Sequence, residues 1–356
     1  MLSSLYTAWI DQLLAGPIPP ETKATCDNCA MLPQSGAPAT GVFFHPVTRC
    51  CTFQPALANY RAGLILSDDE PDLAAGRRTV EKRLSARIAV TPLGMDPSAR
   101  FLLLYKNALG AFGRAPELGC PHQIEGQCGI WRHSPATCTT WFCKHVRGAT
   151  GFEFWNDLAE LLREADSQLG LWCALEMGIE AKPLARLLKP KPMDATDLGA
   201  AIPEDAYRTL WGRWAGREAK FYRACAELVR PLGWHDVARI CGPRLTILSR
   251  LVRERYDKLT SERAPDRPRV GLIQIEGIVA GKYSAVTYSA YDPLRMPTDL
   301  VAVLPHFDGR PMTFWRRSAC SAGSGSIRRW CGAWRTSGFW WKRALCGNED
   351  LEGEGS

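Results

Sequence analysis

The chain has 356 residues, of which 46% are hydrophobic and 23% charged, proportions that are ordinary for a globular protein. A chain of this length can bury a sizeable core without cross-links, so it does not need disulfides to fold. Its formal net charge of +7 equals the charge of segment 315–346, which holds seven Lys and Arg residues and no Asp or Glu. The remainder is balanced overall, which argues against a basic nucleic-acid-binding face spread over a domain.

The N-terminal sequence "MLSSLYTAWIDQLLAGPIPP" predicts a short amphipathic helix that ends at the Gly and Pro residues. It lacks the basic start of a secretion signal, and Asp11 interrupts its apolar residues. No apolar run approaches the ~18–20 residues that a membrane span needs. We therefore expect a cytoplasmic protein with no membrane span, in which thiols stay reduced and clustered cysteines bind metal or do redox work.

Eight of the 14 cysteines form a C-x2-C motif, a vicinal pair and a late group in "GCPHQIEGQCGIWRHSPATCTTWFCKHVRG", residues 119–148. These eight are Cys26, Cys29, Cys50, Cys51, Cys120, Cys128, Cys138 and Cys143. Such a group is compatible with disulfide halves, metal ligands, a redox pair or buried small hydrophobes. Four thiolates suit tetrahedral Zn²⁺ and also suit the irons of an iron–sulfur cluster, so eight could hold two centres. A lone cysteine such as Cys173 is expected to be a small core residue.

The block "CPHQIEGQCGIWRHSPATC" resembles the signature of the YkgJ-type cysteine-cluster family, a zinc- or iron-chelating family. The resemblance covers residues 24–148 and implies that the eight cysteines bind metal. This chain departs from the family pattern in two places: 20 residues separate Cys29 from Cys50, and Ser134 stands where the family has Arg before Pro. The flagellin lysine methylase group is similar in cysteine pattern at a greater distance, which makes catalysis conceivable.

Four histidines lie near the cysteines: His45, His122, His133 and His145. Each could replace a cysteine as a ligand or hydrogen-bond to a thiolate. For His122 and His133 the favoured expectation is an exposed position in a loop. The basic step 144–147 could offset the charge of a site with several thiolates.

Two elements are predicted between the early and late cysteines. Residues 71–88 read as a helix with a solvated, mixed-charge face, preceded by the acidic "SDDEP". Residues 100–107, "RFLLLYKN", are predicted to form a strand. In the late block, Trp131, Trp141 and Phe142 are expected to pack a small loop-rich core.

The middle of the chain is predicted to be helical. Thr150 and Glu153 suggest a capping box that starts a long amphipathic helix. Its apolar stripe consists of Trp155, Leu158, Leu161, Leu162, Ala165, Leu169 and Trp172. Residues 204–231 predict a second helix that Pro231 ends, and residues 233–259 continue helical.

The C-terminal part predicts strands within residues 267–279 and 283–291, joined by a Gly-rich turn. Residues 300–313, "LVAVLPHFDGRPMT", resemble the first turn of the small winged-helix modules that often end peptide- and protein-modifying enzymes. The following segment 315–346 is rich in Arg, Trp, Gly and Ser with no helical period. We interpret residues 315–356 as an out-of-frame translation. The functional alternative is a basic aromatic tail that binds nucleic acid or a membrane surface.

The sequence thus predicts a mostly helical α+β protein in four parts. These are a loop-rich cysteine-cluster metal-binding domain (1–150) packed on a helical region (151–265), a small β, winged-helix-like region (266–314) and an atypical basic tail (315–356). No P-loop, dinucleotide fingerprint, G-x-S-x-G or H-E-x-x-H motif is present, so no nucleophile or general base is nominated.

The first functional hypothesis is a cytoplasmic iron–sulfur protein, acting as a redox partner or as an enzyme that modifies a protein or peptide. The second is a zinc-stabilised binding or scaffold module without chemistry, in which Zn²⁺ supplies folding energy. A nucleic-acid partner is expected only through the 315–346 tail.

Overall fold

The computed structural model describes residues 2–33, 43–108, 110–188, 202–261, 275–279, 281–285 and 287–296. The chain divides into two compact units, Met1–Leu259 and Thr260–Ser356. The first unit is built mainly of helices, and the second contains a small antiparallel sheet. The mostly helical α+β class predicted from the sequence is therefore confirmed. No helix among these described residues is long and apolar enough to cross a membrane.

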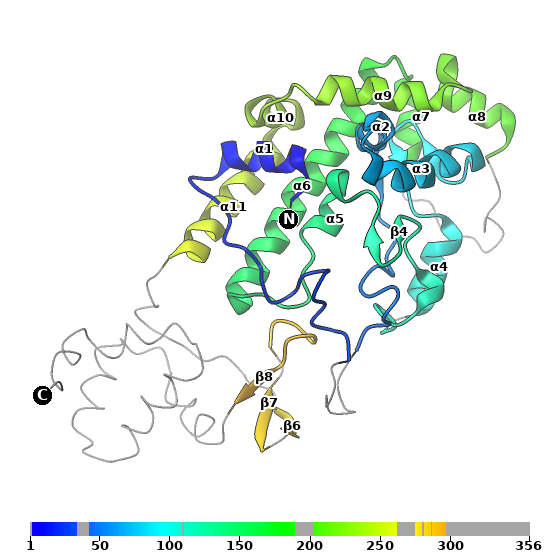
Figure 1. The fold of residues 1–356 in the computed structure, drawn as a ribbon. Helices are drawn as coiled ribbons and strands as arrows, with labels where there is room; N and C mark the ends of the chain where they lie inside the picture. Colours follow the sequence, from blue (N-terminus) through cyan, green and yellow to red (C-terminus); the bar gives the residue numbers. More distant parts are fainter. Residues whose placement is uncertain are drawn as a thin grey trace, which may run out of the picture. The chain divides into compact units, whose positions relative to one another are not determined.

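The first unit contains the following elements in chain order (Figure 1). They are α1 (Ser4–Leu13), β1 (Leu57–Ala58), α2 (Asn59–Ser67), η1 (Pro71–Leu73), α3 (Ala74–Ala86), β2 (Val90–Thr91), β3 (Gly94–Met95), α4 (Ala99–Asn107), η2 (Pro116–Leu118), β4 (Gln123–Ile124), β5 (Gln127–Cys128), η3 (Trp131–His133), α5 (Ala136–Thr139), α6 (Gly148–Glu176), α7 (Ala181–Leu187), α8 (Glu204–Trp211), η5 (Gly212–Trp214), α9 (Glu218–Val229), α10 (Trp234–Cys241) and α11 (Pro243–Thr260).

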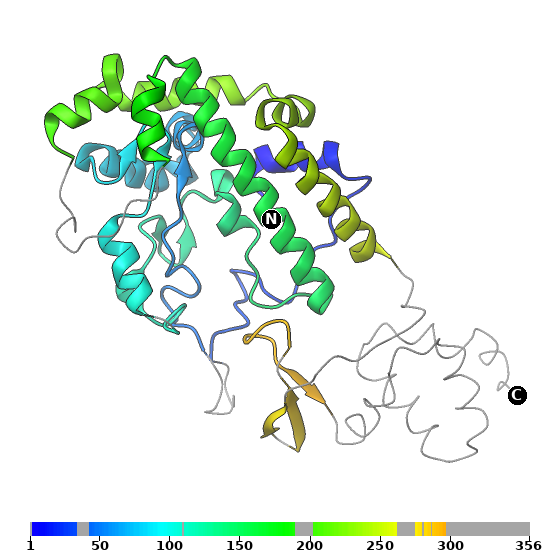
Figure 2. The same ribbon diagram turned by 180° about the vertical axis from the view of Figure 1, so that it is seen from behind.

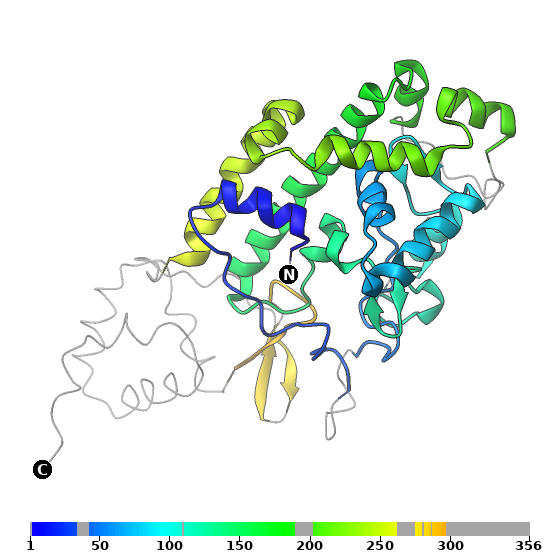
Figure 3. The same ribbon diagram turned by 45° about the horizontal axis from the view of Figure 1, so that its top comes forward.

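Helix α6 is the longest element and runs through the first unit (Figures 1 and 2). Its buried stripe matches the predicted one, except that Trp172 is only half-buried. Helix α11 lies along it, where Arg255 donates to Asp157 at 2.8 Å and to Glu153 at 2.5 Å. Helices α1 and α10 lie beside these two (Figure 3), and the indole of Trp9 donates to the carbonyl of Leu232 at 2.8 Å.

A buried ion pair and its hydrogen bonds join helices α1, α2 and α6. Arg61 of α2 is 0% exposed, and its Nε lies 3.0 and 2.9 Å from the two carboxylate oxygens of Asp166 on α6. The hydroxyl of Tyr6 on α1 donates to the same carboxylate at 2.6 Å, and the hydroxyl of Tyr60 donates to it as well. The guanidinium also stacks on the ring of Tyr6, with 3.7 Å from Cζ to the centroid. Arg61 Nη1 reaches the carbonyl of Ser134 at 3.4 Å, so this network also anchors the late cysteine block.

Helix α2 packs closely on α9. A Cβ at Gly63 would lie 1.8 Å from the carbonyl oxygen of Tyr222, so only glycine permits this approach of the two backbones. Tyr222 in turn donates to the carbonyls of Thr91 at 2.7 Å and Gly94 at 3.0 Å, which ties α9 to a short antiparallel sheet. That sheet has the order β1-β3-β2, with Leu57 opposite Met95 and Val90 opposite Met95.

The second unit is described for one antiparallel sheet of order β6-β7-β8. Its strands are β6 (Ile275–Val279), β7 (Lys282–Ala285) and β8 (Leu294–Met296), with Tyr283 opposite Ile278 and Met296. β6 lies within the predicted strand region 267–279, and β7 begins one residue before the predicted region 283–291. The winged-helix resemblance at 300–313 and the tail at 315–356 lie outside the described residues.

Several predicted elements are confirmed, namely α1, the helix after "SDDEP" (α3), and α10 and α11. The strand predicted at 100–107 is wrong, because this segment is helix α4. The Ser98 hydroxyl caps α4 by accepting from the Phe101 amide at 3.1 Å, and Phe101 stacks on Tyr105 one turn later, with ring centroids 5.7 Å apart.

Two helix boundaries also differ from the prediction. Thr150 does not cap α6, because the helix begins at Gly148. The single helix predicted over 204–231 is two helices, α8 and α9, separated at Gly212 and Gly216, which have φ of +52° and +78°. These left-handed glycines end one helix and redirect the chain before the next.

Candidate metal centre

The late cysteine block begins with a tight hairpin. Strands β4 and β5 pair Gln123 with Cys128 across the two-residue turn of Glu125 and Gly126. Both turn residues have positive φ, 49° and 80°, as a type I′ turn requires. The hairpin fixes Cys128 relative to Cys120, whose carbonyl accepts from the amide of Gln123 at 3.0 Å.

The vicinal pair lies against this hairpin. The amide of Cys120 donates to the carbonyl of Cys51 at 2.8 Å. The Gln123 side-chain amide donates to the carbonyls of Val47 at 2.8 Å and Thr48 at 3.1 Å. These bonds hold segment 47–51 beside segment 120–128, although some 70 residues separate them.

The C-x2-C segment joins the same end of the unit through Arg49. This residue precedes the vicinal pair, has a left-handed backbone (φ 51°), and donates a guanidinium N–H to the carbonyl of Cys26. A left-handed conformation is uncommon for a non-glycine residue and is retained only where surrounding contacts stabilise it. Three cysteine segments that are distant in sequence are thus connected by hydrogen bonds.

A hydrogen bond shifts the pKa values of the two thiols of the vicinal pair in opposite directions. The Cys50 thiol donates a hydrogen bond to Cys51, and this is the largest cause that lowers the pKa of Cys51 to about 7. Burial opposes that shift, and the charge of Arg49 supports it. The same hydrogen bond, followed by burial, raises the pKa of Cys50. Cys51 is therefore the first thiolate to form in this pair.

Four further thiols lie within the electrostatic influence of Cys51. Burial is the largest cause that raises the pKa of Cys120 to about 12, of Cys128 to about 11 and of Cys138 well above its ordinary value. The charge of Cys51 raises each of them further, and it also adds to the raised pKa of Cys26, where burial is again the largest cause. The charge of Cys51 thus acts on thiols from all three cysteine segments.

Backbone amides stabilise two of these sulfurs as thiolates. The N–H groups of His122 and Gln123 act on the sulfur of Cys120 in the direction that lowers its pKa, and the N–H of Ile130 acts likewise on Cys128. Hydrogen bonds from backbone amides to sulfur are one of the means by which proteins tune metal–thiolate centres. At Cys120 and Cys128 these hydrogen bonds offset only part of the rise in pKa that burial causes.

The thiols differ in exposure. Cys26 and Cys138 are exposed, and the other thiols on which the charge of Cys51 acts, Cys120 and Cys128, are half-buried. Soft sulfur donors are the ligands that a thiophilic metal prefers.

The cluster does not have the geometry of a closed metal site. Within the described parts of the chain, no three Cys, His, Asp or Glu residues are arranged so that they could hold one ion. Cys29 is half-buried and its charge acts on Cys26 and Cys50, whereas Cys143 is buried, with 8% of its surface exposed. All eight predicted ligands are thiols and not disulfides.

The histidines differ from the sequence expectation. His122 and His133 were predicted to be exposed, but they are 0% and 9% exposed. His145 is also buried, at 2%, whereas His45 is half-buried and accepts from the Val47 amide through Nδ1 at 3.3 Å. The expectation of exposed loop positions is wrong because the loops fold back onto α2 and α3.

The tautomer of His122 follows from its neighbours. Its Nδ1 lies 2.6 Å from the hydroxyl oxygen of Thr79, and that hydroxyl donates its single proton to the carbonyl of Gly76 at 2.6 Å. Nδ1 must therefore carry the proton and donate to Thr79. Its Nε2 bears the lone pair and is buried without a hydrogen-bond partner among the described residues. Burial lowers the pKa of His122 to about 4, so the ring is neutral at pH 7.

The hydrogen bond between His122 and Thr79 also holds the hairpin against α3. A Cβ at Gly76 would lie 1.8 Å from the carbonyl oxygen of Gly129, so the helix and the hairpin are in backbone contact. Thr79 lies one turn further along the same face of α3 and holds His122. The sequence offered no signal for this arrangement, since neither residue belongs to a recognisable motif.

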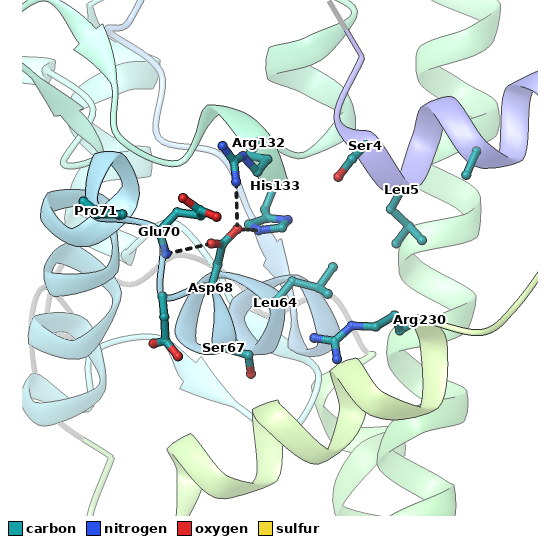
Figure 4. Close-up of a pocket in the computed structure, with 12 residues that line it drawn as sticks. Ser4, Leu5, Leu64, Ser67, Asp68, Glu70, Pro71, Arg132, His133 and Arg230 are labelled. Atoms are coloured by element: carbon teal, nitrogen blue, oxygen red, sulfur yellow. Dashed lines mark hydrogen bonds and ion pairs between the residues drawn. The ribbon is translucent and has the colours of Figure 1, made fainter.

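A groove of about 850 Å³ lies on the other side of the late block, between α1, the end of α2 and η3 (Figure 4). In it, His133 Nε2 lies 2.7 Å from a carboxylate oxygen of Asp68, whose other oxygen accepts from the Glu70 amide at 3.1 Å. Arg132 lies 3.9 Å from the same carboxylate. These contacts hold η3, the turn that spaces Cys128 from Cys138.

The aromatic residues of the block do not form its core as expected. Trp131 and Trp141 are 50% and 42% exposed, and Phe142 is half-buried against Trp155, with ring centroids 4.8 Å apart. Cys173, in contrast, is 0% exposed in the core, as predicted.

Comparison with protein-family models, with curated proteins and with solved structures gives no match to this chain. The YkgJ-type resemblance therefore remains a prediction that depends on the cysteine motifs alone.

Proposed function

We propose that this protein binds a metal through its cysteine cluster, with an iron–sulfur cluster as the bound group. The observation that supports the proposal most directly is the set of hydrogen bonds that joins the three cysteine segments, from the Cys120 amide to the Cys51 carbonyl and from Arg49 to the Cys26 carbonyl. Cysteines that are brought together from distant segments commonly serve metal ligation or redox work.

Cys29, Cys50 and Cys143 complete the proposed set of eight ligands. Ligation requires the sulfurs to approach a common centre more closely than they do here. Because residues on three separate segments must move together, the metal would itself stabilise this end of the unit.

The iron–sulfur group would supply one-electron redox chemistry, and the chain would supply the thiolates and the backbone donors to Cys120 and Cys128. A redox protein or a protein or peptide substrate is the proposed partner. We propose a cytoplasmic location, because reduced thiols suit it.

A zinc-stabilised module without chemistry is the alternative, and one observation favours it. The cysteine segments contain little regular structure besides the two-residue strands β4 and β5 and short helical turns. Such a segment gains folding energy from a structural Zn²⁺ ion, which needs no redox role.

Optical absorption and metal analysis of protein purified without oxygen separate the two. Iron–sulfur protein is expected to be brown, with broad absorption near ~400 nm and with iron and acid-labile sulfide. Colourless protein with stoichiometric zinc would support the alternative, since d¹⁰ Zn²⁺ does not absorb in the visible range. Protein that retains no metal and takes none up would contradict both.

A further inference from the structure

The groove between α1, the end of α2 and η3 contains a histidine with one unused ring nitrogen (Figure 4). His133 is only 9% exposed, and its Nε2 lies 2.7 Å from a carboxylate oxygen of Asp68. Its Nδ1 makes no hydrogen bond in the described part of the chain, and unlike the Nε2 of His122 it is not sealed from solvent. Because His133 lines the groove, this nitrogen faces the groove.

The contact with Asp68 decides which ring nitrogen carries the proton. Burial, partly opposed by Asp68, lowers the pKa of His133, so the ring is neutral at pH 7. An ionised carboxylate can only accept hydrogen bonds, so Nε2 must hold the single proton and donate to Asp68. The other oxygen of Asp68 accepts from the Glu70 amide at 3.1 Å, which keeps the carboxylate in place. Nδ1 of His133 therefore presents a lone pair to the groove, as a hydrogen-bond acceptor.

The cations that line the groove already have carboxylate partners. Arg132 lies 3.9 Å from Asp68 and 3.6 Å from Asp72. Arg230 lies 2.7 Å from Glu227. An anionic ligand would therefore have to compete with carboxylates of the chain itself.

Two carboxylates of the lining, just before η1, have little or no compensation. Asp69 lies 3.8 Å from Arg77, but its side chain is 98% exposed, so water screens this contact strongly. Glu70 is exposed and makes no ion pair within the described ranges. The charge that the groove leaves unpaired is thus negative, and the unused nitrogen of His133 is an acceptor as well.

We propose that this groove binds an organic cation, namely an ammonium or guanidinium group on an aliphatic chain. Such a group carries only N–H donors, which match the acceptors of His133, Asp69 and Glu70. Its chain would pack on Leu5 and Leu64, which also line the groove. The volume of about 850 Å³ is within the ~300–1,000 Å³ of small-ligand sites. The proposal needs no metal, so it and the proposed function can each fail while the other stands.

Isothermal titration calorimetry of the full-length protein tests the proposal with three probes. These are agmatine, which has a guanidinium and an ammonium on one aliphatic chain, an end-blocked peptide with two arginines, and the same peptide with glutamates instead. The double variant Asp69→Asn with Glu70→Gln should bind agmatine roughly five- to tenfold more weakly than wild type. The matched control, Glu117→Gln with Glu125→Gln, changes the net charge equally at exposed positions outside the groove and should bind as wild type does.

The outcomes of the titration are distinct. Tighter binding of agmatine than of the arginine peptide would support the site with a free amine as its ligand, and the reverse order would support it with a peptide side chain. Binding of neither, equal binding of the glutamate peptide, or equal weakening in both double variants would overturn the proposal.

Nitrogen-15 NMR of the imidazole rings tests the acceptor directly. In the free protein Nδ1 of His133 should be the unprotonated nitrogen, and its resonance should shift when agmatine saturates the site. The exposed His235 of α10 should be unaffected. A protonated Nδ1, or a resonance that stays unchanged at saturation, would overturn the proposed role of His133.

Discussion

Replacing Asp166 with Asn removes the counter-charge of Arg61 inside the core. Arg61 is fully buried, and the side chain of Asp166 is only 14% exposed. Breaking a buried ion pair by removing one partner costs about 3–5 kcal/mol, because the remaining charge is left uncompensated. The whole unfolding free energy of a domain is only ~5–15 kcal/mol, so Asp166→Asn should lower the stability of this protein severely.

The assay is equilibrium unfolding in urea, followed by tryptophan fluorescence. The matched control is Asp157→Asn on the same helix, whose partner Arg255 is 27% exposed, and it should cost less than about 1 kcal/mol. The double variant Arg61→Met with Asp166→Leu should recover only part of the loss, since no buried charge then remains but the hydroxyls of Tyr6 and Tyr60 lose their acceptor. A cost of less than about 1 kcal/mol for Asp166→Asn would refute the reasoning.

Further predictions concern the late cysteine block. Burial, partly opposed by Asp68, lowers the pKa of His133 in the folded protein. Below pH ~6.5 the unfolded chain therefore binds more protons than the folded protein, and the free energy of unfolding should fall as the pH drops. In urea unfolding at several pH values, the free energy of unfolding should depend less on pH for His133→Asn than for wild type. The exposed His235→Asn should keep the wild-type dependence, and the same pH dependence in both variants would contradict the role of His133. Gly76→Ala should lower the free energy of unfolding by about 1–3 kcal/mol in the same assay, because the new Cβ would overlap the carbonyl oxygen of Gly129. An unchanged unfolding midpoint would contradict the contact of α3 with the hairpin.

The helical part of the fold was predictable because its signal is local. The stripe from Trp155 to Leu169 repeats at helical spacing and is buried as predicted. The strand predicted at residues 100–107 was wrong because a short apolar run is compatible with a strand as well as with a helix. Ser98, as an N-cap candidate, was the available signal for the helix that forms.

The cysteine motifs identified the segments that hydrogen bonds join in the structure, whereas their role as metal ligands stays a prediction. The surroundings of these cysteines were not predictable. The burial of His122 could not be predicted, because it depends on Thr79, 43 residues away, and on the backbone contact between α3 and the hairpin.

The metal content of a Cys51→Ser variant, measured beside a Cys241→Ser control, tests the central claim most directly. Cys51 is the thiol whose charge acts on Cys26, Cys120, Cys128 and Cys138, whereas Cys241 is a buried thiol of helix α10. Our account predicts that Cys51→Ser loses most of the bound metal per chain while Cys241→Ser retains the wild-type amount. Equal metal content in Cys51→Ser and wild type would contradict it.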